Sequence, residues 1–168
     1  MRSKTFFVLT SVSIAIFFGS STAFCETFQS YKKAGDRYLQ AGETNLAAKE
    51  YQKALLLNPT STAVSFNLAI AYYQSRNFKA AEFTLEKIIK LNPNDYEACY
   101  NLACLKLYRN DMKGARQCLE KARSCCLSDS EFTPLIQNTL EFADKLATLD
   151  PQTRSAVLLY FLTQNHVL

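Results

Sequence analysis

The sequence predicts an all-α fold, an α-solenoid in which helix pairs stack side by side and C-terminal helices cap the last pair. Two observations lead to this prediction. Three segments of the chain, 28–61, 62–95 and 96–129, align with one another at a fixed spacing of 34 residues. The 168 residues contain only four glycines and four prolines, too few for a protein built from short strands and many turns.

The aligned positions carry small residues where two helices must approach closely and large residues where a shared interior must be filled. The expected close contacts pair Gly35 with Ala47, Ala69 with Ala81, and Ala103 with Ala115. Large residues recur at positions that helical spacing directs into the interior. They are Tyr38, Tyr51, Tyr72, Phe78, Leu85 and Leu119. A single pair cannot bury such a face, so neighbouring pairs must stack.

This pattern resembles the tetratricopeptide repeat (TPR). The first unit matches at Ala34, Gly35, Tyr38, Ala47, Tyr51, Ala54 and Pro59, and the second at Leu68, Ala69, Tyr72, Phe78, Ala81, Leu85 and Pro93. The third unit matches at Leu102, Ala103, Met112, Ala115, Leu119 and Ala122. It departs from the family at Lys106, where an aromatic residue is usual, and at Leu127, where proline is usual. The resemblance implies a right-handed α-solenoid of three helix pairs with a concave groove.

The C-terminal segment, residues 130–168, lacks the repeat signature but keeps helical spacing, which predicts capping helices. The first is indicated by Phe132, Leu135, Ile136, Leu140, Ala143 and Leu146. Asp150 and Pro151 then supply an N-cap and a first-turn proline for a last helix that ends near Gln164. Its run 156–162 is apolar on every face. This helix is expected either to pack back on the repeats or to dock on a partner or a second copy.

Residues 1–23 have the pattern of an export signal. Basic Arg2 and Lys4 precede an apolar stretch, too short to span a bilayer comfortably, and then small residues up to Ala23. We expect cleavage after Ala23 and a bacterial periplasmic or envelope-associated location. An uncleaved membrane anchor and a lipid anchor at Cys25 are the alternatives.

The sequence contains no pattern that indicates catalysis, metal binding or nucleic-acid binding. It has no glycine-rich phosphate loop, nucleophile elbow or CxxC spacing, and its one histidine, His166, lies far from the cysteines. Without Arg2 and Lys4, 17 basic residues face 15 acidic ones, and the two signs are interspersed. Phosphate backbones require a basic stripe, which is lacking. We therefore expect no enzyme activity, no cofactor, no metal site and no nucleic-acid partner.

Five of the six cysteines are close together in the third unit and just before the capping segment: Cys99, Cys104, Cys118, Cys125 and Cys126. After export they would meet an oxidising compartment, so one interpretation is a local disulfide whose pairing is open. The other interpretation is that Cys99 and Cys118 serve as small side chains of the core.

The resemblance to TPR proteins also implies which positions of each first helix line the groove. The predicted protein-binding residues are Lys32, Asp36, Leu39, Phe66, Ile70, Tyr73, Tyr100, Leu107 and Tyr108. Because large aromatic residues are favoured as binding anchors, the implied ligand is an apolar or aromatic peptide. The alternative is that the C-terminal helix folds over this surface and fills it.

Some TPR relatives bind the acidic C-termini of heat-shock chaperones through a clamp of lysines, asparagines and an arginine. Lys32 and Asn67 match that clamp. Asp36, Glu97 and Asn101 stand where an asparagine, a lysine and an arginine are expected. The resemblance therefore does not predict the anion site in this chain.

Taken with the absence of catalytic motifs, the repeats predict a scaffold or chaperone-like module that binds a protein or peptide in the bacterial envelope. One alternative is a type III secretion chaperone of the TPR class, which works in the cytoplasm and lacks a leader. Another is an assembly subunit that forms oligomers through its last helix.

Overall fold

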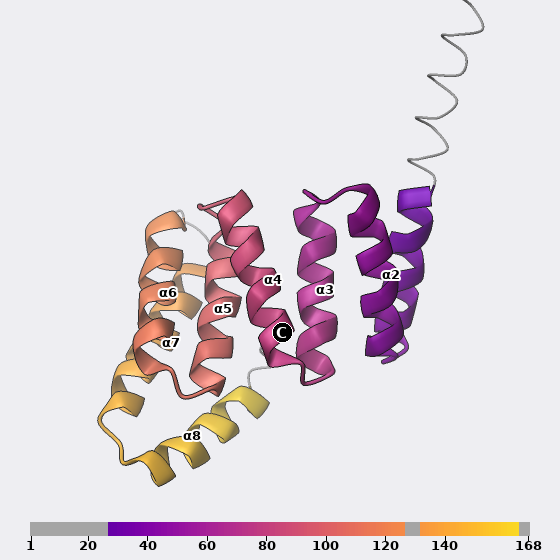
Figure 1. The fold of residues 1–168 in the computed structure, drawn as a ribbon. Helices are drawn as coiled ribbons and strands as arrows, with labels where there is room; N and C mark the ends of the chain where they lie inside the picture. Colours follow the sequence, from indigo (N-terminus) through magenta and orange to yellow (C-terminus); the bar gives the residue numbers. More distant parts are fainter. Residues whose placement is uncertain (1–26, 127–131, 165–168) are drawn as a thin grey trace, which may run out of the picture. The chain divides into compact units, whose positions relative to one another are not determined.

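The computed structural model describes residues 27–126 and 132–164, and within these ranges the chain is helical and contains no strand. The elements are a helix over residues 27–40, α2 (Thr44–Leu57), α3 (Thr62–Gln74), α4 (Phe78–Leu91), α5 (Tyr96–Tyr108), α6 (Met112–Cys125), α7 (Phe132–Ala147) and α8 (Pro151–Gln164) (Figure 1). The predicted all-α fold class is confirmed. None of the described helices is long and apolar enough to cross a membrane. The predicted export signal and its cleavage site lie outside the described residues.

The helix starts follow the 34-residue period of the sequence. The second helices α2, α4 and α6 begin at Thr44, Phe78 and Met112, and the first helices α3 and α5 begin at Thr62 and Tyr96. The period predicted from the residue pattern is therefore the period of the secondary structure.

The turn between the two helices of each pair has the same backbone geometry. Gly42, Arg76 and Asn110 occupy equivalent positions, and their φ angles of 76°, 60° and 62° all lie in the left-handed region. Glycine and asparagine adopt this region readily, whereas arginine does so less often. The turn is thus kept in all three pairs although its residue changes.

The chain forms two compact units, Met1–Val64 and Ser65–Leu168, which are described separately. In the first unit the helix over residues 27–40 packs closely on α2. A Cβ atom added to Gly35 would lie 2.5 Å from Cε1 of Tyr51, whose side chain is completely buried. Ala47 is buried as well. Gly35 is therefore needed for the close approach of the two helices, and its nearest neighbour is Tyr51 rather than the Ala47 expected from the pattern.

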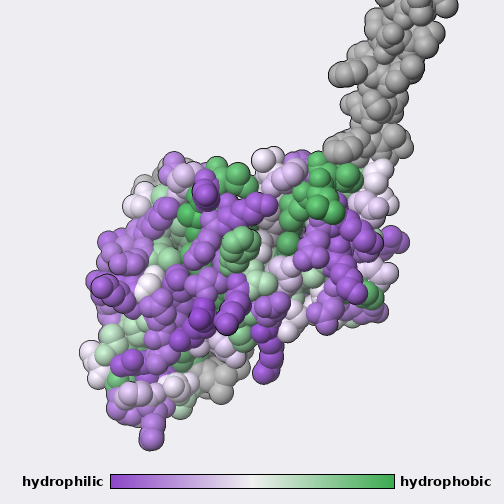
Figure 2. Space-filling view, viewed as in Figure 1, coloured by the Kyte–Doolittle hydropathy of each residue, from purple (hydrophilic) through white to green (hydrophobic). Residues whose placement is uncertain are grey.

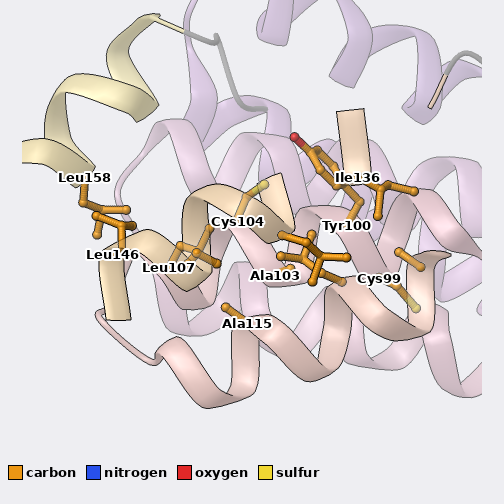
Figure 3. Close-up of a cluster of buried hydrophobic side chains, with 13 residues drawn as sticks. Cys99, Tyr100, Ala103, Cys104, Leu107, Ala115, Ile136, Leu146 and Leu158 are labelled. Atoms are coloured by element: carbon orange, nitrogen blue, oxygen red, sulfur yellow. The ribbon is translucent and has the colours of Figure 1, made fainter. Parts of the chain in front are cut away.

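Two hydrophobic clusters lie in the described part of the second unit. The first, between α3, α4 and α5, consists of Ala69, Ala81, Leu85, Ile88, Ala98, Leu102 and Leu105. The second lies between α5, α6, α7 and α8, and part of it is drawn in Figure 3. From α7 it receives Ile136, Leu140, Ala143 and Leu146. With these residues, α7 covers the apolar side that α5 and α6 would otherwise expose.

Lys106 stands where the first two repeats carry an aromatic residue, and the structure shows what replaces that packing. Its Nζ lies 2.9 Å from Oε1 of Glu82 on α4 and 3.8 Å from Oδ2 of Asp111. Arg109 also forms an ion pair with Glu82. The hydrogen bond with Glu82 raises the pKa of Lys106. In the third repeat, ion pairs between α4 and α5 thus take the place of an aromatic contact.

The corner between α7 and α8 is held by polar contacts. Oδ1 of Asp150 accepts hydrogen bonds from the backbone N–H groups of Gln152 and Thr153, at 3.0 and 3.1 Å. The guanidinium group of Arg154 donates to the carbonyl oxygens of Leu146 and Leu149, at 2.9 and 2.7 Å. The predicted N-cap and first-turn proline are confirmed. Arg154 in addition caps the C-terminal end of α7, whose last carbonyl groups lack helical partners.

Candidate functional site

The inner row of α3 consists of Phe66, Ile70 and Tyr73. These residues follow one another at helical spacing, so they share one face of the helix, and each side chain is half-buried. Phe66 and Tyr73 pack at the margin of the first hydrophobic cluster. Their outer parts remain accessible in the described residues.

Three aromatic rings from three helices continue this row. The ring centroids of Tyr73 and Phe78 are 5.6 Å apart, and those of Phe78 and Tyr108 are 4.5 Å apart. All three side chains are half-buried. We call Tyr73, Phe78 and Tyr108 the aromatic edge. Burial raises the pKa of Tyr73, with smaller contributions from Tyr108 and Cys104, so its hydroxyl group is neutral at physiological pH.

Phe78 was predicted as a core residue and not as part of the groove. It is the first residue of α4 and directly follows the turn that ends α3, so it lies between the last turns of α3 and α5. The turn between α3 and α4 is tight, so the first residue of α4 must lie close to the end of α3. From this turn, the position of Phe78 next to the predicted groove residue Tyr73 could have been inferred.

Two predicted groove residues of the third repeat are not accessible. Tyr100 is 6% exposed and Leu107 is completely buried, so the expectation that they line an open groove is wrong for this structure. The hydroxyl oxygen of Tyr100 lies 3.3 Å from Oγ1 of Thr139 on α7. The reason for the burial is that α7 and α8 cover this part of α5 and bring their own apolar residues against it.

The last helix lies on an unusual side of the repeats. The second helix of the third repeat, α6, contacts the first helix of that repeat, α5, and the next helix in the chain, α7. In contrast, α8 contacts α7 and the preceding first helix, α5. In Figure 1 it crosses near the lower end of α5. It therefore lies on the side that bears Leu107, a predicted groove position, and the alternative that the C-terminal helix folds over this surface agrees with the structure at the third repeat.

Two predicted groove residues of the first repeat, Lys32 and Asp36, form an ion pair with each other. Nζ of Lys32 lies 2.9 Å from Oδ2 of Asp36, and the hydroxyl group of Tyr51 donates to Oδ1 of Asp36 at 2.8 Å. Leu39 is half-buried. Because a carboxylate already compensates Lys32, an acidic peptide terminus would gain little attraction there. This arrangement agrees with the expectation that the anion clamp is not formed.

The five cysteines in the described residues are free thiols. Burial raises the pKa of Cys99 to about 11 and that of Cys104 to about 12, so both stay protonated at neutral pH. Cys99 and Cys104 belong to the second hydrophobic cluster, and Cys118 packs against both clusters. Cys99 and Cys118 therefore act as small core side chains here, and no disulfide joins the described cysteines. Within residues 27–126 and 132–164, no group of three His, Cys, Asp or Glu side chains could hold a metal ion.

Other exposed apolar side chains are scattered. Phe83 on α4 is 70% exposed, while Leu91 and Leu135 are exposed to a lesser extent. Figure 2 shows mostly hydrophilic residues on the left part of the view, where α5, α6 and α7 lie in Figure 1. Single exposed apolar residues are ordinary features of protein surfaces. The inner row of α3 and the aromatic edge are distinguished because their apolar side chains are contiguous.

Comparisons with known proteins agree with this geometry. Two family models, both described as tetratricopeptide repeat, match residues 38–102 and 96–122. The chain belongs to the tetratricopeptide-repeat family. The resemblance of the repeat pattern to that family is thus confirmed. No curated protein sequence matches this TPR chain.

Solved TPR structures share its fold at low sequence identity. The Yersinia enterocolitica type III secretion translocator chaperone SycD aligns with a TM-score of 0.68 and 14% identity, over 74% of this chain and 88% of SycD. The first TPR domain of Spaghetti (RPAP3), bound to an HSP90 peptide, aligns with a TM-score of 0.65 and 18% identity, over 74% of this chain and 95% of that domain. The TPR2B domain of yeast Sti1, in its pHsp70 complex, aligns with a TM-score of 0.65 and 19% identity, over 71% of this chain and 98% of that domain. These similarities show the fold.

Proposed function

We propose that this TPR protein is a non-catalytic interaction module that binds an apolar or aromatic segment of a partner protein along the inner row of α3 and the aromatic edge. The observation that carries the proposal is the contiguous, half-buried set Phe66, Ile70, Tyr73, Phe78 and Tyr108. Aromatic side chains of this kind supply much of the binding energy at protein interfaces. Two proteins of the same fold bind peptides, which supports the proposal. Spaghetti binds an HSP90 peptide, and SycD binds a peptide of the translocator YopD.

Alanine at Phe66 or Tyr73 is expected to weaken partner binding about tenfold, which corresponds to about 1.4 kcal/mol. The partner is first captured by crosslinking in native cells and affinity purification, and is then titrated against each variant. Phe83→Ala serves as the matched control, because Phe83 is an exposed aromatic residue outside the proposed surface. Wild-type affinity for both Phe66→Ala and Tyr73→Ala, with unchanged helical circular dichroism, would contradict the proposal.

We further propose that the module acts after export, in a bacterial periplasm or envelope. The support is the basic, apolar and small-residue succession of residues 1–23. Intact-mass analysis of the protein from its native source is expected to give a chain that starts at Phe24. A chain that starts at Met1 would contradict cleavage and favour the uncleaved membrane anchor. A lipid on Cys25 would contradict cleavage after Ala23 and favour the lipid anchor.

A second candidate is favoured by the structural similarity to SycD, a type III secretion chaperone. It shares the proposed binding surface but requires a location in the cytoplasm. Fractionation of native cells separates the two candidates, since the first expects the protein outside the cytoplasm and the second inside it. An assembly subunit that uses its last helix would instead show a mass that depends on concentration.

A further inference from the structure

The place where α8 docks is built from residues of the predicted groove. Leu158 of α8 is 5% exposed and belongs to the same cluster as Leu107 of α5 and Leu146 of α7. Figure 3 places Leu158 next to Leu146, with Leu107 on the neighbouring helix. By the family's repeat positions, Leu107 would line the concave surface. Leu158 of α8 therefore already occupies the end of the concave surface that the third repeat forms.

The described part of α8 is attached by few buried contacts. Among its side chains from Pro151 to Leu158, only Leu158 is buried, and Arg154 and Val157 are half-buried. By comparison, α7 buries five side chains, those of Ile136, Thr139, Leu140, Ala143 and Leu146. The described hydrogen bonds from α8 to the end of α7 and the corner after it come from Arg154, in the first turn of α8. Within residues 151–158, polar contacts thus hold the first turn of α8, and Leu158 is the buried anchor beyond that turn.

The docking site continues directly into the proposed binding surface. Leu107 precedes Tyr108 of the aromatic edge in α5, and Tyr108 packs against the second hydrophobic cluster, to which Leu107 and Leu158 belong. A ligand that lies on Tyr73 and Tyr108 would therefore reach the margin of the site that holds Leu158. This continuity joins the two surfaces into one.

We propose that α8 is an internal occupant of the binding groove and that the partner is an apolar helix that displaces it. The proposal rests on the function proposed above and adds the chemistry of the ligand. The helix must present a leucine-sized side chain to the site formed by Leu107 and Leu146, as Leu158 does. The sequence of α8 from Ala156 to Leu162 is apolar throughout, which provides a template for such a ligand.

The test uses the full chain and a synthetic, fluorescently labelled peptide with the sequence of residues 151–164 as the probe. The wild-type chain is expected to bind the peptide weakly, because its own α8 occupies the site. Leu158→Glu should drive α8 out and strengthen peptide binding at least tenfold. Ala156→Glu is the matched control, because Ala156 is an exposed residue of the same helix, and it should bind the peptide as the wild-type chain does.

A peptide that itself carries Leu158→Glu should bind none of the three chains. Equal peptide affinity for wild type and Leu158→Glu would overturn the proposal. If circular dichroism shows that Leu158→Glu loses helical structure beyond α8, Leu158→Ala replaces it with the same expected direction. The peptide assay does not use the natural partner. Equal peptide affinities together with weakened partner binding by Phe66→Ala and Tyr73→Ala would reject the displacement of α8. The proposed binding surface would then still stand.

Discussion

Replacing Leu85 with alanine is expected to lower the free energy of unfolding by about 2–5 kcal/mol. Leu85 is completely buried in the cluster between α3, α4 and α5, next to the small residues Ala69 and Ala81 and the large residues Leu102 and Leu105. Removing its branched end loses apolar burial and leaves a cavity that neighbouring helices can fill only in part. Urea unfolding followed by helical circular dichroism measures the loss.

Phe83→Ala is the control for this variant, since Phe83 lies two residues away on α4 and is mostly exposed. Its free energy of unfolding should stay within about 0.5 kcal/mol of the wild-type value. If both variants lost the same stability, the assignment of α4's inner and outer faces would be incorrect.

Ala81→Leu is expected to destabilise the protein by about 1–3 kcal/mol through overpacking. The side chain of Ala81 is completely buried and belongs to the cluster that joins α4 to α3 and α5. The added branched group can enter only if the helices move apart. Thermal melting, compared with Lys79→Leu at an exposed position of α4, measures the effect. A melting temperature equal to that of the wild-type chain would show that the second repeat does not pack as described.

The sequence was sufficient to predict the repeat period and the buried face of most helices. Ala81, Leu85 and Ile88 lie one turn apart and are buried together, so helical spacing identifies them without a structure. Asp95 directly precedes α5, a position where aspartate is favoured as an N-cap, and its side chain accepts a hydrogen bond from the N–H of Ala98 at 2.9 Å. These features depend on local spacing, which the sequence contains directly.

The extent of the accessible groove could not be predicted in the same way. The run from Ala156 to Leu162 is apolar on every face, so periodicity does not indicate which face is buried or against what. The position of Leu158 depends on the corner that Asp150 and Arg154 form, which involves carbonyl groups of α7 rather than a residue pattern. For this reason residue spacing offered the burial of Leu107 only through the alternative in which the C-terminal helix covers the groove.

The replacement at Lys106 shows the same limit. The family pattern indicates only that an aromatic residue is missing there. Glu82 on α4 becomes the partner of Lys106 because α4 and α5 lie side by side, which the pattern does not indicate. The export prediction concerns residues outside the described ranges and stays a prediction.

We expect the partner to contact the inner row of α3 and the aromatic edge. Site-specific photocrosslinking tests it most directly, with benzoylphenylalanine placed at Tyr73 in one variant and at Phe83 in another, each expressed in native cells. The expected result is a crosslinked partner from position 73 and none from position 83. A crosslink from position 83 alone, in protein with unchanged helical circular dichroism, would contradict it.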